Sequence, residues 1–193
     1  MTKSSPTLVP GEQYISVLAP VPDALSGRIF AWQQQHHVAH ARRHSHITVH
    51  IAAQPGQQQI QKVAQKLGEQ SSFIVGLGEP ASFLPETSVS FLPVNQGAYA
   101  LDMLREVSSA CLGPSSSPFE YIPHLTLAYQ LEESALRDSL EEFADLPQEL
   151  LTFEVERVGI FRYTGSEWEL LQEVPLQQLP SAHDEAITDF LSE

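Results

Sequence analysis

One pattern occurs twice in this chain: an apolar strand, a helix, and then a strand that carries His-x-Thr. The first copy runs from SVLAPV (16–21) to HITV (46–49), and the second runs from SVSFLPV (88–94) to HLTL (124–127). The motif histidine follows the end of the first strand by 25 residues in one copy and by 30 in the other. Repetition at a long period indicates duplicated architecture. If the halves pack about a pseudo-two-fold axis, their equivalent strands face each other across one cleft.

Local patterns predict the elements around these motifs. Apolar runs bounded by Pro or Gly favour strands, and apolar residues at helical spacing favour helices. Strands are expected at 14–21, 46–52, 71–79, 88–94 and 120–129, and helices at 22–41, 57–70, 98–112 and 133–146. A closing hairpin is expected from 151–163 and 167–176, with its turn at 164–166.

This order of elements predicts the α+β class, with two antiparallel sheets lining a central cleft and helices outside. We expect a single domain at residues 1–180, built from halves at about 12–87 and 88–176. Residues 181–193 form an acidic C-terminal tail that can make a short helix.

Charge and residue content narrow the classes of protein further. Hydrophobic residues make up 42% of the 193 residues and charged residues 18%, as in a globular protein rather than a disordered one. The formal net charge of −14 repels polyanions, so we expect no long nucleic-acid groove, and only a short or terminal phosphate ligand in a locally basic pocket. Cys111 is the single cysteine, which excludes an internal disulfide and a thiolate zinc site. Without an apolar leader or a membrane-length run, we expect a cytoplasmic monomer that does not bind membranes.

The two motifs are His46-Ile47-Thr48-Val49 and His124-Leu125-Thr126-Leu127. With 8 His and 8 Thr in the chain, chance predicts roughly 0.06 matches to His-apolar-Thr-apolar, so two matches are informative. In a strand, His and Thr two residues apart share one face. The alternative is that both histidines are ordinary, satisfied residues on half-buried strands.

Two such motifs about eighty residues apart, in a duplicated α+β chain, resemble the two-histidine (2H) phosphoesterase superfamily. The group called 2'-5' RNA ligases or RNA 2',3'-cyclic phosphodiesterases is similar in its PHLTLA segment and in its ending, here RVGIFRYTGSEWELLQEVPL. The resemblance covers roughly residues 12–176. It implies a bilobal fold with catalytic His46 and His124, and with Thr48 and Thr126 binding the substrate phosphate.

The chemistry that the resemblance implies suits these residue types. Opening a cyclic phosphodiester needs one group to take a proton from water and another to give one to the departing ribose oxygen. Imidazole, with an ordinary pKa near 6.5, can do either at neutral pH. Threonine hydroxyls can donate to the non-bridging phosphate oxygens. No metal or cofactor is required, and the sequence does not say which histidine is the acid.

Other histidines flank the first motif. His44 and His50 fall at the same two-residue spacing as His46, so we expect them on its face, either at the rim of the site or as ordinary neighbours. A zinc site is a further alternative, and it would need His44 and His46 to converge with His36, His37 or His40. That alternative leaves the second His-x-Thr strand without an explanation.

The chain offers few cations for a phosphate. Arg42 and Arg43 form the only adjacent basic pair, and Arg43 is expected to hold a substrate phosphate unless the pair is simply solvated. Arg157 and Arg162 are five positions apart, so in a regular strand only one of them can point into the cleft. Many relatives have a basic residue just after the second motif, whereas this chain has none before Arg137. Three aromatic residues could stack on a base or belong to the core, namely Tyr14, Phe91 and Tyr121.

The resemblance therefore implies a metal-independent phosphodiesterase that converts 2',3'-cyclic phosphate ends of RNA or nucleotides to 2'-phosphates, with 2'-5' ligation as the reverse reaction. Its partner would be an RNA end or a small cyclic nucleotide. Cleavage of 2'-5' bonds is also compatible with the motifs. The alternative from another class is a non-catalytic nucleotide- or phosphate-binding module on the same fold.

Overall fold

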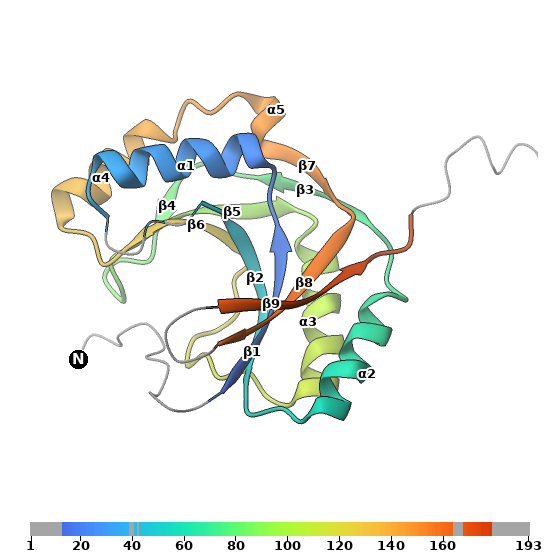
Figure 1. Cartoon of the computed structure of the whole chain (residues 1–193). Coiled ribbons are helices and arrows are strands. Elements are labelled where there is room, and N and C mark those ends of the chain that lie inside the picture. Colours follow the sequence, from blue (N-terminus) through green and yellow to red (C-terminus); the bar gives the residue numbers. More distant parts are fainter. Residues whose placement is uncertain (1–12, 39–40, 42, 164–167, 179–193) are drawn as a thin grey trace, which may run out of the picture.

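The computed structural model describes residues 13–38, 41, 43–163 and 168–178 (Figure 1). Within these residues the elements follow the chain in this order: β1 (Tyr14–Pro20), α1 (Asp23–Gln35), β2 (His46–Ala53), α2 (Gln57–Leu67), β3 (Phe73–Leu77), β4 (Ala81–Ser82), β5 (Val89–Gln96), α3 (Ala98–Leu112), β6 (His124–Tyr129), α4 (Glu133–Glu142), α5 (Gln148–Leu151), β7 (Thr152–Val155), β8 (Arg157–Tyr163) and β9 (Trp168–Pro175).

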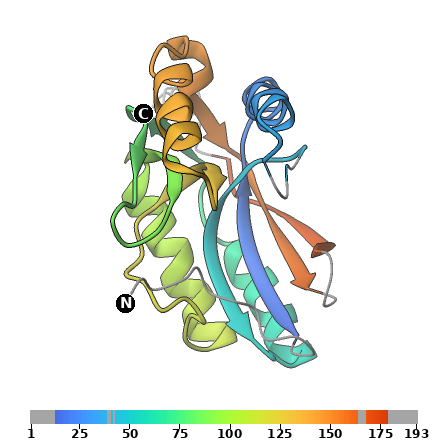
Figure 2. The ribbon, with the colours of Figure 1, turned by 90° about the vertical axis from the view of Figure 1, so that its left-hand side faces the viewer.

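The strands form one curled sheet rather than the two separate sheets that the sequence predicts (Figure 2). Their order is β7-β3-β5-β6-β2-β1-β8-β9, with β4 beside β5, and the named pairs are antiparallel. The halves join where Ile47 of β2 pairs with Leu125 of β6. The predicted α+β class is confirmed. The prediction of two sheets is wrong because the two motif strands hydrogen-bond to each other.

The first long helix of each half lies against the motif strand of the other half. In α1, the Gln33 side-chain amide donates to the Leu127 carbonyl of β6 at 2.5 Å, and Trp32 meets Phe143 edge-on with ring centroids 5.8 Å apart. In the second half, α3 packs with α2 and against β2. Figure 1 shows the two groups, with α1 and α4 at one end of the sheet and α2 and α3 at the other. This exchange ties both halves into one core.

The sequence repeat has a counterpart in the register of the strands. β1 lies beside β2 as β5 lies beside β6. In both pairs a proline lies opposite the motif histidine, and an apolar residue lies opposite the motif threonine. The four cross-strand pairs are Pro20–His46, Leu18–Thr48, Pro93–His124 and Phe91–Thr126. Both halves therefore pair their strands in the same way around the motifs.

One helix and one strand differ most from the expected bounds. The helix expected at 22–41 ends at Gln35, and His37 has a φ of +52°, which an α-helix does not contain. The strand expected at 151–163 divides at Glu156. The part before the division pairs with β3, and the part after it pairs with β1 and β9. One continuous apolar pattern in the sequence thus forms two strands that have different neighbours in the sheet.

The second motif strand begins at His124 rather than at residue 120, directly after Pro123, which has no N–H for a strand ladder. The hairpin of β8 and β9 forms as expected. Its predicted turn at 164–166 and the predicted tail at 181–193 lie outside the described residues. In the part of the chain that the structure describes, no helix is both long and apolar enough to cross a membrane.

Candidate functional site

The pairing of Ile47 with Leu125 brings the two motifs side by side in the middle of the sheet. Continued by one residue each way, this antiparallel register sets each motif histidine opposite the threonine of the other motif. Opposite residues have Cβ atoms roughly 4.5–5.5 Å apart, and diagonal neighbours are roughly 7–8 Å apart. The two histidines therefore lie on a diagonal, with a threonine beside each. We call this group of four side chains the tetrad: His46, Thr48, His124 and Thr126.

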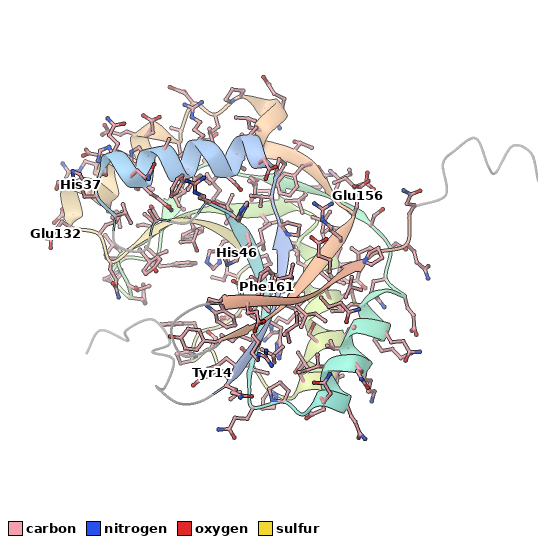
Figure 3. The ribbon with its side chains drawn as sticks, viewed as in Figure 1. Tyr14, His37, His46, Glu132, Glu156 and Phe161 are labelled. Atoms are coloured by element: carbon pink, nitrogen blue, oxygen red, sulfur yellow. The ribbon has the colours of Figure 1, made fainter. Side chains whose placement is uncertain are left out.

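The alternation along both strands separates the tetrad from the core. The residues between and after the tetrad members are 0–1% exposed and belong to the hydrophobic core: Ile47, Val49, Leu125 and Leu127. Thr48 is exposed, and the other three tetrad members are half-buried. We call the surface that carries the tetrad the tetrad face. In Figure 3 the labelled His46 marks its position on β2.

His124 is held in one orientation by its own strand end. Its Nδ1 lies 2.6 Å from the Ile122 carbonyl oxygen, which can only accept, so Nδ1 carries a hydrogen and donates it. The ring also meets Phe83 and Phe91 at centroid distances of 5.0 and 5.3 Å. Burial lowers the pKa of His124 below its ordinary value, although the hydrogen bond to Ile122 opposes part of this shift. The neutral ring thus has its lone pair on Nε2.

Thr48 is anchored through its backbone. β6 begins at His124, so beyond that point the loop after α3 takes the place of a neighbouring strand along β2. Tyr121 in this loop donates its hydroxyl hydrogen to the Thr48 carbonyl oxygen at 3.1 Å. The Arg105 guanidinium lies 4.9 Å from the centre of the Tyr121 ring. Burial raises the pKa of Tyr121 above its ordinary value, Asp102 adds to the shift and Arg105 opposes it, so the hydroxyl stays protonated at neutral pH.

His50 does not share the face of His46, contrary to the expectation from its spacing. A register shift in the β1–β2 pair lies between Val17 and Leu18, so that His50 is paired with the fully buried Val17. His50 is 2% exposed and donates from Nε2 to the Gly113 carbonyl at 3.0 Å. Burial lowers its pKa, the bond to Gly113 opposes the shift, and the Arg105 charge adds to it. A rim position for His50 does not fit this burial.

His44 and Arg43 lie just before the first motif strand. His44 is exposed in a bend. Arg43 is exposed as well, with its guanidinium 5.5 Å from the centre of the Phe30 ring on α1. The helix thus gives Arg43 an aromatic support close to the start of β2.

Arg157 and Arg162 face opposite sides of β8, as their spacing predicts. Arg157 lies two residues before Gly159, which pairs with Leu18 and therefore belongs to the tetrad face. Arg162 pairs with the buried Ile15 on the other face. Arg157 is exposed and Arg162 is half-buried. Both form ion pairs with β9, Arg157 with Glu173 at 3.3 Å and Arg162 with Glu169 at 2.8 Å.

Of the three aromatic residues considered from the sequence, Tyr14 and Phe91 are about as buried as the core, at 5% and 6% exposure. Phe83, which no sequence pattern selects, stacks on Phe91 with centroids 3.9 Å apart and reaches His124. It lies in a Pro-containing connection, where no periodicity predicts the direction of a side chain. Among the described residues, no three His, Cys, Asp or Glu side chains gather closely enough to hold a metal ion.

Solved structures with the same fold come from two bacteria. The structure of E. coli LigT complexed with 3'-AMP matches with a TM-score of 0.63 at 17% identity, over 86% of this chain and 99% of that one. TT0787 of Thermus thermophilus matches with a TM-score of 0.60 at 16% identity, over 86% of this chain and 98% of that one. At these identities the likeness establishes the fold. None of the curated proteins matches the chain.

The sequence itself carries the family assignment. The model of the 2'-5' RNA ligase superfamily matches residues 21–167, a span that includes both motifs and the whole tetrad. The fold, the duplicated register and this match agree, and the chain belongs to the 2'-5' RNA ligase superfamily of 2H phosphoesterases.

Proposed function

We propose that the protein is a metal-independent 2H phosphoesterase that opens 2',3'-cyclic phosphate ends of RNA or nucleotides to 2'-phosphates. The observation that carries the proposal is the pairing of Ile47 with Leu125, because it sets two histidines and two threonines together on one open face. The solved structures of E. coli LigT with 3'-AMP, ATP and phosphate support a nucleotide as the ligand of this fold.

The state of His124 assigns the proton transfers. Because burial lowers the pKa of His124, its Nε2 is unprotonated at neutral pH and takes a proton from the attacking water. The water oxygen forms a bond to phosphorus, and the bond from phosphorus to the ribose 3'-oxygen breaks on the opposite side. His46, in its protonated form, gives its proton to that departing oxygen. The product is a 2'-phosphate with a free 3'-hydroxyl.

The threonines and an arginine bind the phosphate in this scheme. Thr48 and Thr126 donate their hydroxyl hydrogens to the two non-bridging oxygens, where negative charge grows in the transition state. Arg43 supplies a positive charge from the segment before β2. Arg157 is a second source of charge, because it lies on the tetrad face and its exposed partner Glu173 can be exchanged for a phosphate.

Hydrolysis of 2',3'-cyclic AMP and of an RNA oligomer with a 2',3'-cyclic phosphate end tests the proposal, with EDTA present. We expect His46→Ala and His124→Ala each to lower kcat by roughly 100- to 10,000-fold. His44→Ala is the matched control, because it removes an exposed histidine from the same segment and leaves the tetrad intact. Thermal unfolding should change least for His44→Ala, which is exposed, and somewhat more for His124→Ala, because its ring contacts Phe83 and Phe91.

Each result has a definite reading. Unchanged turnover in either tetrad variant contradicts two-histidine catalysis. Tight binding of nucleotides by the wild-type protein without any turnover favours the alternative, a binding module on the same fold. The position of the phosphate in the product, 2' or 3', reports which bond breaks.

A further inference from the structure

Beside the first motif strand, β2, an aromatic ring that the proposed reaction does not use lies on the tetrad face. Leu18 of β1 pairs with Thr48 on one side and with Gly159 on the other, so the three residues form a row across three strands. A Cβ at Gly159 would lie 2.5–3.3 Å from three ring atoms of Phe161. The missing side chain therefore lets the Phe161 ring cover the end of this row, and the ring remains half-buried rather than enclosed.

Beside the second motif strand, β6, the corresponding row ends in the same way. Phe91 of β5 pairs with Thr126 on one side and with Ala81 of β4 on the other. Phe83 follows two residues after this small residue and stacks on Phe91, with an interplanar angle of 18°. Phe83 is half-buried, and its ring also reaches His124.

Phe83 and Phe161 thus occupy equivalent places relative to the two motif strands. Each row consists of the motif threonine, an apolar residue and a small residue, which is Gly159 in one row and Ala81 in the other. Each phenylalanine comes two residues after the small residue in the sequence. Each row spans two strand spacings, so it extends roughly 10 Å from the tetrad, in opposite directions along the sheet. In the view of Figure 3, the labelled Phe161 lies between His46 and Tyr14.

We propose that Phe83 and Phe161 are base-stacking residues, so that the site holds two nucleobases, one on each side of the phosphate. The inference rests on the proposed function for the place of the phosphate between the two rings. It assigns the substrate class as an internucleotide phosphodiester or an RNA end with its neighbouring nucleotide, rather than an isolated cyclic nucleotide.

The overall charge of the protein favours this mode of binding. Proteins with a basic surface gain most of their affinity for nucleic acids by neutralising phosphates. A chain with a net charge of −14 gains little affinity in this way. Stacking of a base on an aromatic ring needs no positive charge, and it tolerates every base because each has a π-face. Two rings on opposite sides of the tetrad also fix the direction of the ligand across the site.

Equilibrium binding tests the inference without depending on turnover. Titration calorimetry compares adenylyl-(2'→5')-adenosine with adenosine 2'-phosphate, using the His46→Ala/His124→Ala double variant so that the dinucleotide is not consumed. We expect the dinucleotide to bind roughly 5- to 150-fold more tightly, the gain that stacking of one further base gives. On this background, Phe83→Ala or Phe161→Ala should weaken dinucleotide binding by a similar factor.

Two further variants separate stacking from folding. Phe161→Leu keeps an apolar cover over Gly159 but has no π-face, and it should also lose affinity for the dinucleotide. Leu170→Ala is the matched control, because Leu170 pairs with Phe161 across β8 and β9 and is 48% exposed. It should bind both ligands as the parent does.

The outcomes distinguish this inference from the proposed function. Equal affinity for the two ligands, or dinucleotide affinity that Phe161→Leu and Phe83→Ala leave unchanged, overturns the two-base site. If the dinucleotide binds through both rings but the wild-type protein hydrolyses neither it nor any cyclic phosphate, the two-base site stands and the proposed function fails. If cyclic phosphates are hydrolysed and the dinucleotide gains no affinity, the reverse holds.

Discussion

The two motif strands carry histidine and threonine at the same positions relative to the neighbouring strand, and yet the contacts around them differ. β6 begins at its motif histidine, and the ring of His124 is held by the Ile122 carbonyl and by two phenylalanines. β2 also begins at its motif histidine, and both strands shift register just after the motif threonine. Next to the first motif, however, the recorded support is the Tyr121 hydroxyl, which donates to the Thr48 carbonyl oxygen from a loop. These contacts hold the backbone of the threonine in the first motif and the ring of the histidine in the second.

A duplicated motif therefore need not have the same neighbours in both copies. Around His124, apolar rings exclude water and lower the pKa, which favours the neutral form. Along β2, the next histidine on the strand, His50, is turned into the core and serves packing. Three experiments measure how far the two strands differ in function, and the one with the strongest expected change comes first.

The strongest change should come from a different leaving group. Thymidine 5'-(p-nitrophenyl) phosphate releases p-nitrophenolate, which needs no proton to depart. If His46 is the acid, His46→Ala should lose far less activity on this substrate than on 2',3'-cyclic AMP. His124→Ala, which removes the base, should lose roughly 100- to 10,000-fold on both substrates.

The ratio of the two rates for each variant is the measurement. Rescue of His124→Ala instead of His46→Ala would mean that the roles are exchanged. Equal losses of both variants on both substrates would mean that neither histidine acts mainly on the leaving group.

A smaller effect is expected where a loop replaces the missing part of β6. Tyr121→Phe removes the hydroxyl that donates to Thr48 but keeps the ring beneath Arg105. We expect a loss of about 1 kcal/mol in the free energy of unfolding, as for one hydrogen bond. Because the Thr48 hydroxyl would lose its fixed position, kcat should fall several-fold while KM changes little.

Tyr99→Phe is the matched control for this prediction, since Tyr99 is 78% exposed at the start of α3. Urea unfolding and steady-state kinetics measure both variants. If Tyr121→Phe behaves like Tyr99→Phe in both assays, the hydrogen bond from Tyr121 to the Thr48 carbonyl contributes neither to stability nor to kcat.

The weakest effect concerns the pH dependence of stability, through His50. Its pKa is lowered in the folded state, so below about pH 6.5 the unfolded chain takes up the proton first and stability falls. Above that pH the ring is neutral in both states and contributes no pH dependence. His50→Gln keeps a donor for the Gly113 carbonyl but cannot titrate, so its loss of stability towards acid should be shallower than that of the wild type.

Thermal melts at several pH values between 5 and 8 check this prediction, with His44→Gln at an exposed position as the control. A variant His50→Gln that loses as much stability towards acid as the wild type would contradict it. At neutral pH the substitution should cost only what the changed packing of a buried side chain costs.

The sequence alone predicts a good part of the fold and of the candidate site. The spacing of apolar residues predicts both motif strands and the helices that precede them, since those patterns are local. It also predicts that His46 and Thr48 share one face. The prediction from spacing fails for His50, because a bulge reverses the direction of every later side chain on a strand. No local residue pattern indicates this register shift.

Residues outside the motifs were harder to predict for the same reason. Tyr121 and Phe83 act on the tetrad from connections that have no period, so the direction of their side chains depends on contacts far along the chain. The continuous apolar pattern at 151–163 did not predict that the strand divides at Glu156. A strand pattern does not indicate which neighbouring strand each part pairs with.

Local sequence is enough to establish two strand–helix–strand halves, each presenting His and Thr on one side of a strand. This follows because the period of two in a strand is a property of the backbone. Folding of the whole chain made the two strands neighbours in one sheet, turned His50 inward, and set Phe83 and Phe161 on either side of the tetrad. Those facts depend on long-range register, which is set by the packing of the whole core.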